Sequence, residues 1–348
     1  MLGTLLERES YYRAFQTHDA RFDGHIFMGV TSTGIYCRPV CRTRTPKFEN
    51  CRFFASAPAA QEAGFRPCLR CRPETAPHVA SWRGTFNTVG RALNLIAGGA
   101  LDESKSSVED LALRLGVGDR HLRRLFQQHL GASPIAVAQT RRVLFAKHLL
   151  HDTQLPMTKI AIAAGFGSVR RFNEVFRDMF GQPPSELRRR TNSDTYVKDL
   201  VTLRLSYRPP YDWPGMLDAL GTRANKSLEY VEDGIWHRQF VLNGKPGHVA
   251  VAHLPERNGV AVTIRFPEVQ ALSTIVTRVK RVFDLDADIS TTGSHLSSDP
   301  ELAPLIAKRP GLRTPRDWDS RLSLNITGPP AWRPWSAYAT EHLRMASV

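Results

Sequence analysis

VEDLALRLGVGDRHLRRLFQQHLGASP (residues 108–134) and MTKIAIAAGFGSVRRFNEVFRDMFGQPP (residues 157–184) are two copies of one pattern, and they decide the fold of the middle of the chain. Each copy predicts a helix, a glycine-containing turn and a second helix. One residue is inserted at the start of the second helix of the later copy. The first two of the recurring pairs are 49 residues apart and the others 50: Ala112 and Ala161, Gly116 and Gly165, Leu122 and Phe172, Phe126 and Phe176, Gly131 and Gly181, Pro134 and Pro184.

The second helix of each copy is expected over about residues 119–129 and 168–179. Asp119 and Ser168 are the expected N-caps, because their short side chains can accept from the first free backbone amides. Apolar residues recur along both segments at helical spacing, which places them in a core rather than on the surface. These expected core residues are Leu122, Leu125, Phe126, Phe172, Val175 and Phe176.

Residues 88–190 resemble the DNA-binding domain of AraC-type regulators, most specifically in GFGSVRRFNEVFRDMFGQPPSELR (165–188). The resemblance implies that the second helix of each copy enters a major groove of DNA, with the two grooves one turn apart. Arg and Asn can read guanine and adenine edges respectively. A generic helical bundle is the alternative, which the repeat and the local basic charge disfavour. The outward candidates for DNA contact are Arg120, His121, Arg124, Val169, Arg170, Arg171 and Asn173.

The positive charge of the chain lies almost entirely in its first half. Residues 1–190 hold 28 Lys and Arg against 16 Asp and Glu, a net charge of +12, whereas residues 191–348 have a net charge of +2. A basic half attracts a polyanion such as DNA, although a solvated surface is the simpler alternative. No run approaches the roughly 18 apolar residues of a membrane span. The first residues lack the apolar stretch of a secretory signal, so we expect no membrane partner and a cytoplasmic location.

The five cysteines all precede residue 72, and four of them form two close pairs. Cys37 and Cys41 are separated by three residues, and Cys68 and Cys71 by two. This spacing is typical of a tetrahedral structural Zn²⁺ site, and such a metal would stabilise a region with little core of its own. Four unrelated buried cysteines are the alternative. Cys51 fits neither pair, and we expect it to be a small core residue.

GVTSTGIYCRPVCRTRTPKFENCRFF (29–54) and AGFRPCLRCRP (63–73) together resemble the N-terminal domain of the Ada adaptive-response family, over about residues 8–77. The resemblance implies repair of methyl phosphotriesters in DNA by irreversible transfer of the methyl group to the first zinc-bound cysteine. That acceptor would be Cys37, and Cys41, Cys68 and Cys71 would complete the metal site.

Zinc chemistry is compatible with that role, because the metal keeps sulfur as a thiolate, which is the nucleophilic form. Four thiolates on Zn²⁺ carry a net charge of −2, and methylation of one reduces it to −1, so DNA phosphates would be repelled less. Several arginines flank the cysteines and are candidates for contact with the DNA backbone. For each of them a solvated surface charge is the alternative: Arg38, Arg42, Arg44, Arg66 and Arg70.

The third region predicts a small antiparallel sheet with helices on one face. Strands are expected over residues 201–210, 228–233, 234–242, 247–254 and 259–266, and helices over 211–220 and 269–285. The stretch LRLSYRPPYDWPGMLDALGTRANKSLEYVEDGIWHRQF (203–240) resembles the N-terminal domain of AlkA-class 3-methyladenine DNA glycosylases, and the resemblance continues to about Arg313.

In that class a helix-hairpin-helix domain follows, with the catalytic aspartate and the base pocket. Only 35 residues follow Arg313, and AWRPWSAYATEHLRMA (331–346) resembles the last helix of the class. We interpret residues 314–348 as the remnant of an internal deletion, with Asp317 and Asp319 as solvated loop residues, and expect no glycosylase activity. The Pro-Cys-His-Arg site of O6-methylguanine repair is also missing, because no cysteine follows Cys71.

The sequence therefore predicts a multidomain α+β protein. The predicted parts are an Ada-like zinc and methyl-acceptor domain (1–80), an AraC-type double helix-turn-helix domain (85–190), an AlkA-like α+β domain (195–313) and the tail (314–348), with a linker at 191–195. We expect a transcriptional regulator of the alkylation-damage response that binds double-stranded DNA and, as an activator, RNA polymerase. Its enzymatic role would be a single methyl transfer. The alternatives are a transcription factor with a purely structural zinc and a DNA glycosylase.

Overall fold

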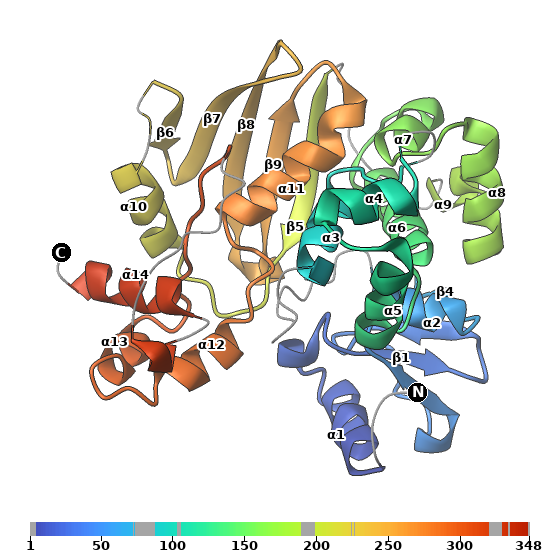
Figure 1. Ribbon diagram of the computed structural model, residues 1–348, viewed down its shortest axis with the longest axis horizontal. Coiled ribbons are helices and arrows are strands. Elements are labelled where there is room, and N and C mark those ends of the chain that lie inside the picture. Colours follow the sequence, from blue (N-terminus) through green and yellow to red (C-terminus); the bar gives the residue numbers. More distant parts are fainter. Residues whose placement is uncertain are drawn as a thin grey trace. The chain divides into compact units, whose positions relative to one another are not determined.

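The computed structural model describes residues 5–71, 73, 88–102, 106–188, 199–223, 225, 227–319, 329–332 and 335–346 (Figure 1). The chain forms two compact units. The first comprises the described residues of Met1–His78, Trp82–Asp199 and Glu268–Thr274, and the second comprises those of Leu200–Pro267 and Ile275–Val348. The predicted linker at 191–195 lies outside the described residues.

The first unit begins with a cysteine module, residues 5–71, built around a four-stranded sheet of order β3-β1-β2-β4. Helix α1 contributes Phe15 to an apolar cluster with Phe53 and the cysteines, while α2 contributes Ala60 to a second cluster with Tyr36. Short 3-10 turns occupy Ala20–Phe22 and Phe48–Asn50. The elements are α1 (Leu5–Gln16), β1 (Phe27–Val30), β2 (Ile35–Cys37), β3 (Cys51–Phe54), α2 (Ala57–Glu62) and β4 (Arg66–Pro67).

A helical module, residues 88–188, follows and contains both predicted helix-turn-helix copies. All six expected core residues of the second helices are at most 6% exposed. Gly116, Gly131, Gly165 and Gly181 have positive φ angles and lie at helix ends, where glycine is favoured. The helices are α3 (Thr88–Ala97), α4 (Val108–Leu115), α5 (Asp119–Leu130), α6 (Pro134–Asp152), α7 (Met157–Ala163), α8 (Val169–Phe180) and α9 (Pro184–Arg188).

One of the two predicted N-caps is wrong. Ser168 caps α8 by accepting from the amide of Arg171. Asp119, in contrast, is the first residue of α5, and Gly118 is the cap, without a side-chain hydrogen bond. The inserted residue of the second copy lies in the turn before α8, so the shorter first turn brings Asp119 into the helix, where it forms an ion pair with Arg123 at 3.5 Å.

The long helix α6 connects the two copies and is buried on nearly every side. Val143, Ala146 and Leu149 are each 0% exposed. Thr140, Leu144 and Lys147 are also buried, and their spacing of four and three residues places them on one face of the helix. Leu144 packs in the apolar cluster of the cysteine module that includes Tyr36. Helix α6 therefore belongs to the cores of both modules.

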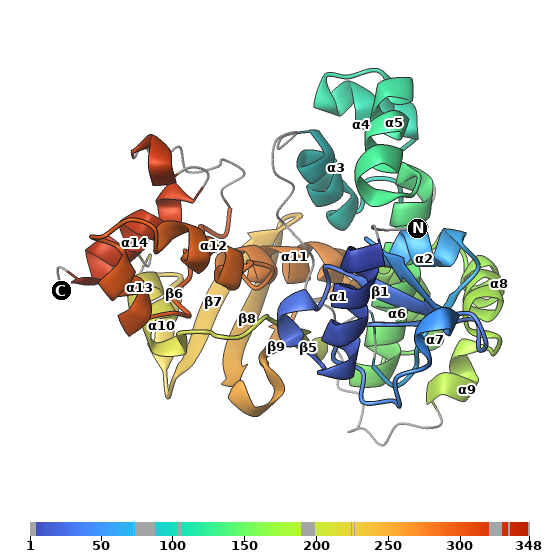
Figure 2. The same cartoon turned by 90° about the horizontal axis from the view of Figure 1, so that it is seen from below.

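The second unit is built on an antiparallel five-stranded sheet of order β5-β9-β8-β7-β6, and α11 runs along one of its faces (Figures 1 and 2). Alternate residues of the central strands are buried, as the sequence predicts for a sheet covered on one face. The strands are β5 (Leu200–Ser206), β6 (Glu229–Glu232), β7 (Ile235–Leu242), β8 (Lys245–Leu254) and β9 (Gly259–Arg265). The helices are α10 (Trp213–Arg223), α11 (Leu272–Val282), α12 (Ile289–Leu296), α13 (Ala303–Lys308) and α14 (Ser336–Ala346), with 3-10 turns at Pro255–Arg257, Val269–Ala271 and Pro330–Trp332.

The described part of the predicted tail packs into the second unit. Trp318 is 2% exposed, and Ala339 of α14 lies in an apolar cluster with α12 and α13. Asp317 and Asp319 are exposed, as expected for loop residues. Asp319 also forms ion pairs with Arg238 at 3.4 Å and Arg278 at 3.1 Å, so it helps hold this segment on the sheet.

Candidate metal centre

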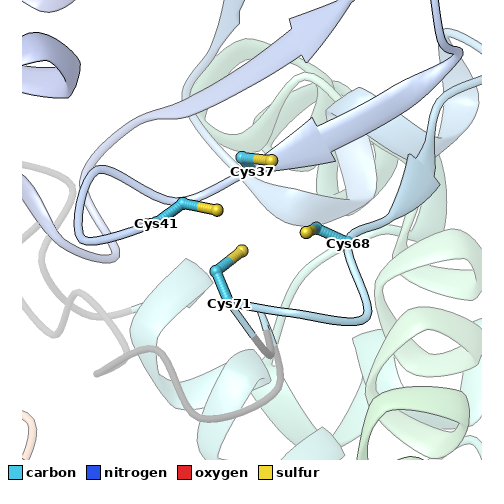
Figure 3. Close-up of side chains that lie close together, drawn as sticks. All are labelled: Cys37, Cys41, Cys68 and Cys71. Carbon is cyan, nitrogen blue, oxygen red and sulfur yellow. The ribbon is translucent and has the colours of Figure 1, made fainter. Parts of the chain in front are cut away.

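Strand pairing brings the two cysteine pairs together. Strands β2 and β4 are parallel, with Tyr36 opposite Pro67, so Cys37 and Cys68 occupy the next positions on neighbouring strands. The amide of Cys68 donates to the carbonyl oxygen of Tyr36 at 3.0 Å. Figure 3 shows the side chains of all four paired cysteines pointing toward a common centre.

The four sulfur atoms fit a tetrahedral Zn²⁺ site. The Sγ atoms of Cys37, Cys41, Cys68 and Cys71 all lie within 4.8 Å of one another. Zn–S bonds of about 2.3 Å in a tetrahedron place the sulfur atoms roughly 3.8 Å apart. Three of the four residues are buried and Cys71 is partly exposed. The predicted zinc site is confirmed by this convergence.

Four thiols crowded in this way ionise unequally, because a protonated thiol donates a hydrogen bond to a neighbouring sulfur. Hydrogen bonds with Cys41, Cys68 and Cys71, together with burial, raise the pKa of Cys37. The hydrogen bonds with Cys37 and the other thiols lower the pKa of Cys68. A divalent cation at the centre would hold all four as thiolates.

Cys51 lies outside this group, as predicted. It is 1% exposed, and its thiol donates to the carbonyl oxygen of Lys47 at 3.3 Å. Burial raises the pKa of Cys51 to about 11, so it is protonated and poorly nucleophilic at neutral pH.

Arg38 was predicted to contact DNA, and the structure corrects that assignment. Its side chain is 7% exposed and forms a buried ion pair with Asp23, whose side chain is 6% exposed. The Arg38 Nε atom donates to Asp23 Oδ1 at 2.7 Å, and Nη1 donates to the carbonyl oxygen of Cys71 at 3.5 Å. Arg38 therefore ties the first cysteine pair to the second. Nothing in the local sequence identifies Asp23, 15 residues earlier, as its partner.

The other four flanking arginines, Arg42, Arg44, Arg66 and Arg70, are exposed and can reach a ligand. Arg66 also faces the helical module. A Cβ atom added to Gly181 would lie 2.8 Å from Arg66 Nη1, so this guanidinium lies at the carboxyl end of α8, where a cation is favoured.

The outward residues of α5 and α8 lie where the helical pattern predicts. Arg120, His121 and Arg124 of α5 and Arg170 and Arg171 of α8 are exposed, while Val169 and Asn173 are partly exposed. An ion pair of 2.9 Å joins Arg170 to Glu174 on the surface of α8. Arg123 of α5 is bound to Glu109 at 2.9 Å as well as to Asp119.

Polar contacts that sequence reasoning missed join the cysteine module to the helical module. The Gln61 side chain donates to the Tyr36 hydroxyl at 2.9 Å and accepts from the Thr140 hydroxyl of α6 at 2.6 Å. Further along α6, Lys147 Nζ donates to the carbonyl oxygen of Cys68 at 3.2 Å. The one sequence signal of these contacts was that α6 lacks a continuous polar face, which indicates burial on more than one side.

The two modules also meet at the carboxyl end of α5. The Ser56 hydroxyl, which caps α2, donates to the carbonyl oxygen of Leu130 at 2.7 Å. Together with Arg66 at the end of α8, this contact places the cysteine module against the ends of both α5 and α8.

Within the described residues, no helix is both long and apolar enough to cross a membrane.

Comparison with known proteins finds three family matches along the chain. They are the metal binding domain of Ada at residues 10–74, a helix-turn-helix domain at 111–190 and the AlkA N-terminal domain at 202–319. All three resemblances inferred from the sequence are thereby confirmed.

Individual relatives match different shares of the chain. The probable bifunctional transcriptional activator/DNA repair enzyme AlkA of Mycobacterium tuberculosis is 39% identical over 315 residues, which cover 89% of this chain and 63% of that protein. The chain thus spans under two thirds of the length of that relative. A solved structure of the DNA methyl phosphotriester repair domain of E. coli Ada is 42% identical, covering 21% of this chain and 78% of that domain, with a TM-score of 0.19.

The bifunctional transcriptional activator/DNA repair enzyme AdaA of Bacillus subtilis is 31% identical over 191 residues, which cover 53% of this chain and 85% of that protein. Most of that relative is therefore matched by about half of this chain. With its four-cysteine zinc site and its helix-turn-helix repeat, the chain belongs to the Ada family of bifunctional transcriptional activators and DNA repair enzymes.

Proposed function

We propose that this protein binds double-stranded DNA, accepts a methyl group from a DNA methyl phosphotriester on Cys37, and then acts as a transcriptional activator that engages RNA polymerase. The single observation that carries the proposal is the convergence of four thiols in the same compact unit as two helix-turn-helix copies. The net charge of +12 over residues 1–190 supports DNA as the ligand.

The transfer is a displacement at the methyl carbon. The Cys37 sulfur donates an electron pair to the methyl carbon while the carbon–oxygen bond breaks, and that bond's electrons stay on the phosphate oxygen. The phosphodiester leaves as an anion and Cys37 becomes an S-methyl thioether. Zn²⁺ held by the four cysteines supplies the thiolate form of the nucleophile. Arg42, Arg44 and Arg70 are exposed and would hold the DNA backbone.

The same transfer provides a signal. The centre changes from −2 to −1, so the surface repels DNA phosphates less and binds more tightly, most clearly at low salt. A stoichiometric acceptor thus reports damage through the affinity of the regulator for DNA.

We expect the protein in the cytoplasm, because that reducing compartment keeps cysteine thiols reduced.

Mass spectrometry of the full chain after exposure to methyl phosphotriester DNA tests the proposal. We expect one added methyl group, mapped to Cys37 by peptide analysis. Cys71 is the most exposed of the four ligands, so mapping must distinguish these two residues. Cys51→Ala is the matched control, since it removes a buried thiol outside the site and should leave the transfer unchanged. A methyl group found elsewhere, or none, contradicts the assignment.

Two alternatives predict different outcomes. A purely structural zinc predicts no methyl transfer and equal DNA affinity before and after exposure. A glycosylase predicts release of free base from DNA that contains 3-methyladenine. We expect no release from this polypeptide, because its exposed Asp319 is held by ion pairs with two arginines, whereas base release needs a carboxylate that faces a flipped base.

A further inference from the structure

The hydroxyl group of Thr43 contacts the sulfur atom of one of the four zinc ligands. Its Oγ1 atom lies 3.1 Å from Cys41 Sγ, which is hydrogen-bond distance for sulfur. Thr43 is partly exposed and follows Cys41 by two residues, so the segment that carries the ligand also carries its hydrogen-bond partner. Once metal binding has removed the thiol proton, the hydroxyl can only donate and the sulfur can only accept.

The sulfur atoms of the centre differ in the hydrogen bonds that survive ionisation. The hydrogen bonds to Cys37 come from the other three cysteines, and these bonds disappear when all four thiols lose their protons. Cys68 also accepts from the backbone amide of Cys71, as Cys41 does from the Thr43 hydroxyl. The amide and the hydroxyl keep their protons, so Cys68 and Cys41 each retain a hydrogen bond as thiolates.

Burial does not distinguish the two ligands of the first pair. Cys37 is 6% exposed and Cys41 is 5% exposed. The Thr43 hydroxyl, in contrast, gives Cys41 a hydrogen bond that acts on its reactivity. Methyl transfer removes the negative charge of the attacking sulfur. A hydrogen bond to that sulfur therefore stabilises the reactant more than the transition state and slows the reaction.

We propose that Thr43 is a positioning residue that determines the methylation site: its hydroxyl lowers the nucleophilicity of Cys41 and thereby directs the methyl group to Cys37. The inference deepens the proposed function and rests on it for the identity of the acceptor. Removal of the hydroxyl makes Cys41 a competing acceptor, whereas a merely structural change alters both cysteines alike.

The test uses the full chain with Thr43→Val, Thr43→Ser and the matched control Thr31→Val. Val keeps the branched shape without the hydroxyl, and Ser keeps the hydroxyl. Thr31→Val removes a hydroxyl of the same module that donates to the carbonyl oxygen of Asn50 at 3.3 Å. Each zinc-loaded protein reacts with methyl iodide: an S–C bond forms, the C–I bond breaks, and iodide leaves with that bond's electrons. Fragmentation mass spectrometry of the peptide that contains Cys37 and Cys41 assigns the first methyl group.

For Thr43→Val we expect the rate of methylation at Cys41, relative to that at Cys37, to rise on the order of threefold to tenfold. The thiolate-to-metal charge-transfer band of the Co²⁺-substituted protein should move to longer wavelength, because one sulfur loses a hydrogen bond. Thr43→Ser and Thr31→Val should match the parent in both readouts. An unchanged ratio in metal-bound Thr43→Val would overturn the proposal, as would an equal rise at both cysteines.

If Thr43→Val does not bind metal, Thr43→Ala decides the question, because it lacks the hydroxyl and also fills less space. Metal binding by Ala with a raised share of methylation at Cys41 supports the proposal, and an unchanged share overturns it. Loss of metal by both Val and Ala, with retention by Ser, shows that the hydroxyl holds the centre together and does not select the acceptor, which also overturns it.

Methyl iodide reads the centre without DNA, so the two proposals fail separately. A parent protein that accepts no methyl group from DNA would contradict the proposed function. The ratio of methylation at Cys41 and Cys37 by methyl iodide still tests the role of Thr43.

Discussion

The two helix-turn-helix copies share one template but are held in place differently. In the first copy, Gly116 ends α4 with a φ of 73°, and a Cβ atom added there would meet nothing within 4 Å. In the second, Gly165 has a φ of 89°, and a Cβ atom would lie 2.4 Å from the Asp102 side chain. Gly116 is thus required for backbone conformation alone, whereas Gly165 is required for both backbone conformation and packing. A sequence repeat establishes equivalent positions, but equivalent positions need not tolerate equal changes.

Gly165→Ala gives the largest effect that this comparison predicts. We expect about 3–5 kcal/mol of destabilisation, because left-handed backbone strain adds to overlap with a side chain that is buried and bound to Arg141. Gly116→Ala should cost only the strain, about 1–2 kcal/mol. Urea unfolding of the full chain followed by far-UV circular dichroism measures both.

Tryptophan fluorescence in a Trp82→Phe background serves as the control for this pair, because the five remaining tryptophans all lie in the second unit. Its transition should not move in either variant. Equal destabilisation by the two substitutions would contradict the packing difference between the copies.

The exposed surfaces of α5 and α8 also differ. Arg170 of α8 is bound only loosely to Glu174, since its side chain is 89% exposed, so it can turn to DNA at little cost. We expect Arg170→Ala or Arg171→Ala to weaken binding to an operator selected from random DNA by about 1–3 kcal/mol if the residue reads a base edge. An equal loss of affinity for unrelated DNA would indicate a phosphate contact instead. The slope of log affinity against log salt concentration should then be smaller by about one.

Arg123→Ala is the matched control on α5, because both Glu109 and Asp119 form ion pairs with its guanidinium and offset its charge. Its effect on affinity should be small, whereas Arg120→Ala and Arg124→Ala should resemble the α8 variants. An intact affinity in all four variants of the exposed arginines would place the DNA-binding surface elsewhere.

Substitutions at the N-caps of α5 and α8 have the smallest predicted effects on stability. Ser168→Ala should destabilise the first unit by about 1 kcal/mol, because the amide of Arg171 loses its acceptor. Gly118→Ser in the first copy should stabilise it by about 0.3 kcal/mol by providing the missing cap. Circular dichroism in urea distinguishes the signs, and a loss of stability with serine at 118 would show that the first turn cannot accommodate a capping side chain.

Local patterns were sufficient to predict the repeat, the strands of the second unit and the four zinc ligands. Each of these rests on spacing along a short stretch, such as the three residues between Cys37 and Cys41. The cap at Asp119 was wrong because the pattern located the inserted residue only approximately. Arg38 was misplaced because its burial depends on Asp23, and basic residues near a reactive site usually lie on the surface.

Contacts between modules were beyond sequence reasoning. Gln61 and Thr140 are 79 residues apart, and neither belongs to a motif. Lys147 looks like an ordinary surface residue of a helix, since lysine is rarely buried. Only the folded chain shows that these side chains lie on the face of α6 that meets the cysteine module.

The double burial of α6 also bears on how such proteins diversify by gene recombination. Leu144 covers aromatic rings of the cysteine module, among them Phe27, Tyr36 and Phe65. A gene fusion that joined the cysteine module to an unrelated DNA-binding domain would expose those rings to water. The new domain would have to supply an apolar residue equivalent to Leu144. The shared helix therefore favours recombination events that keep the two modules together.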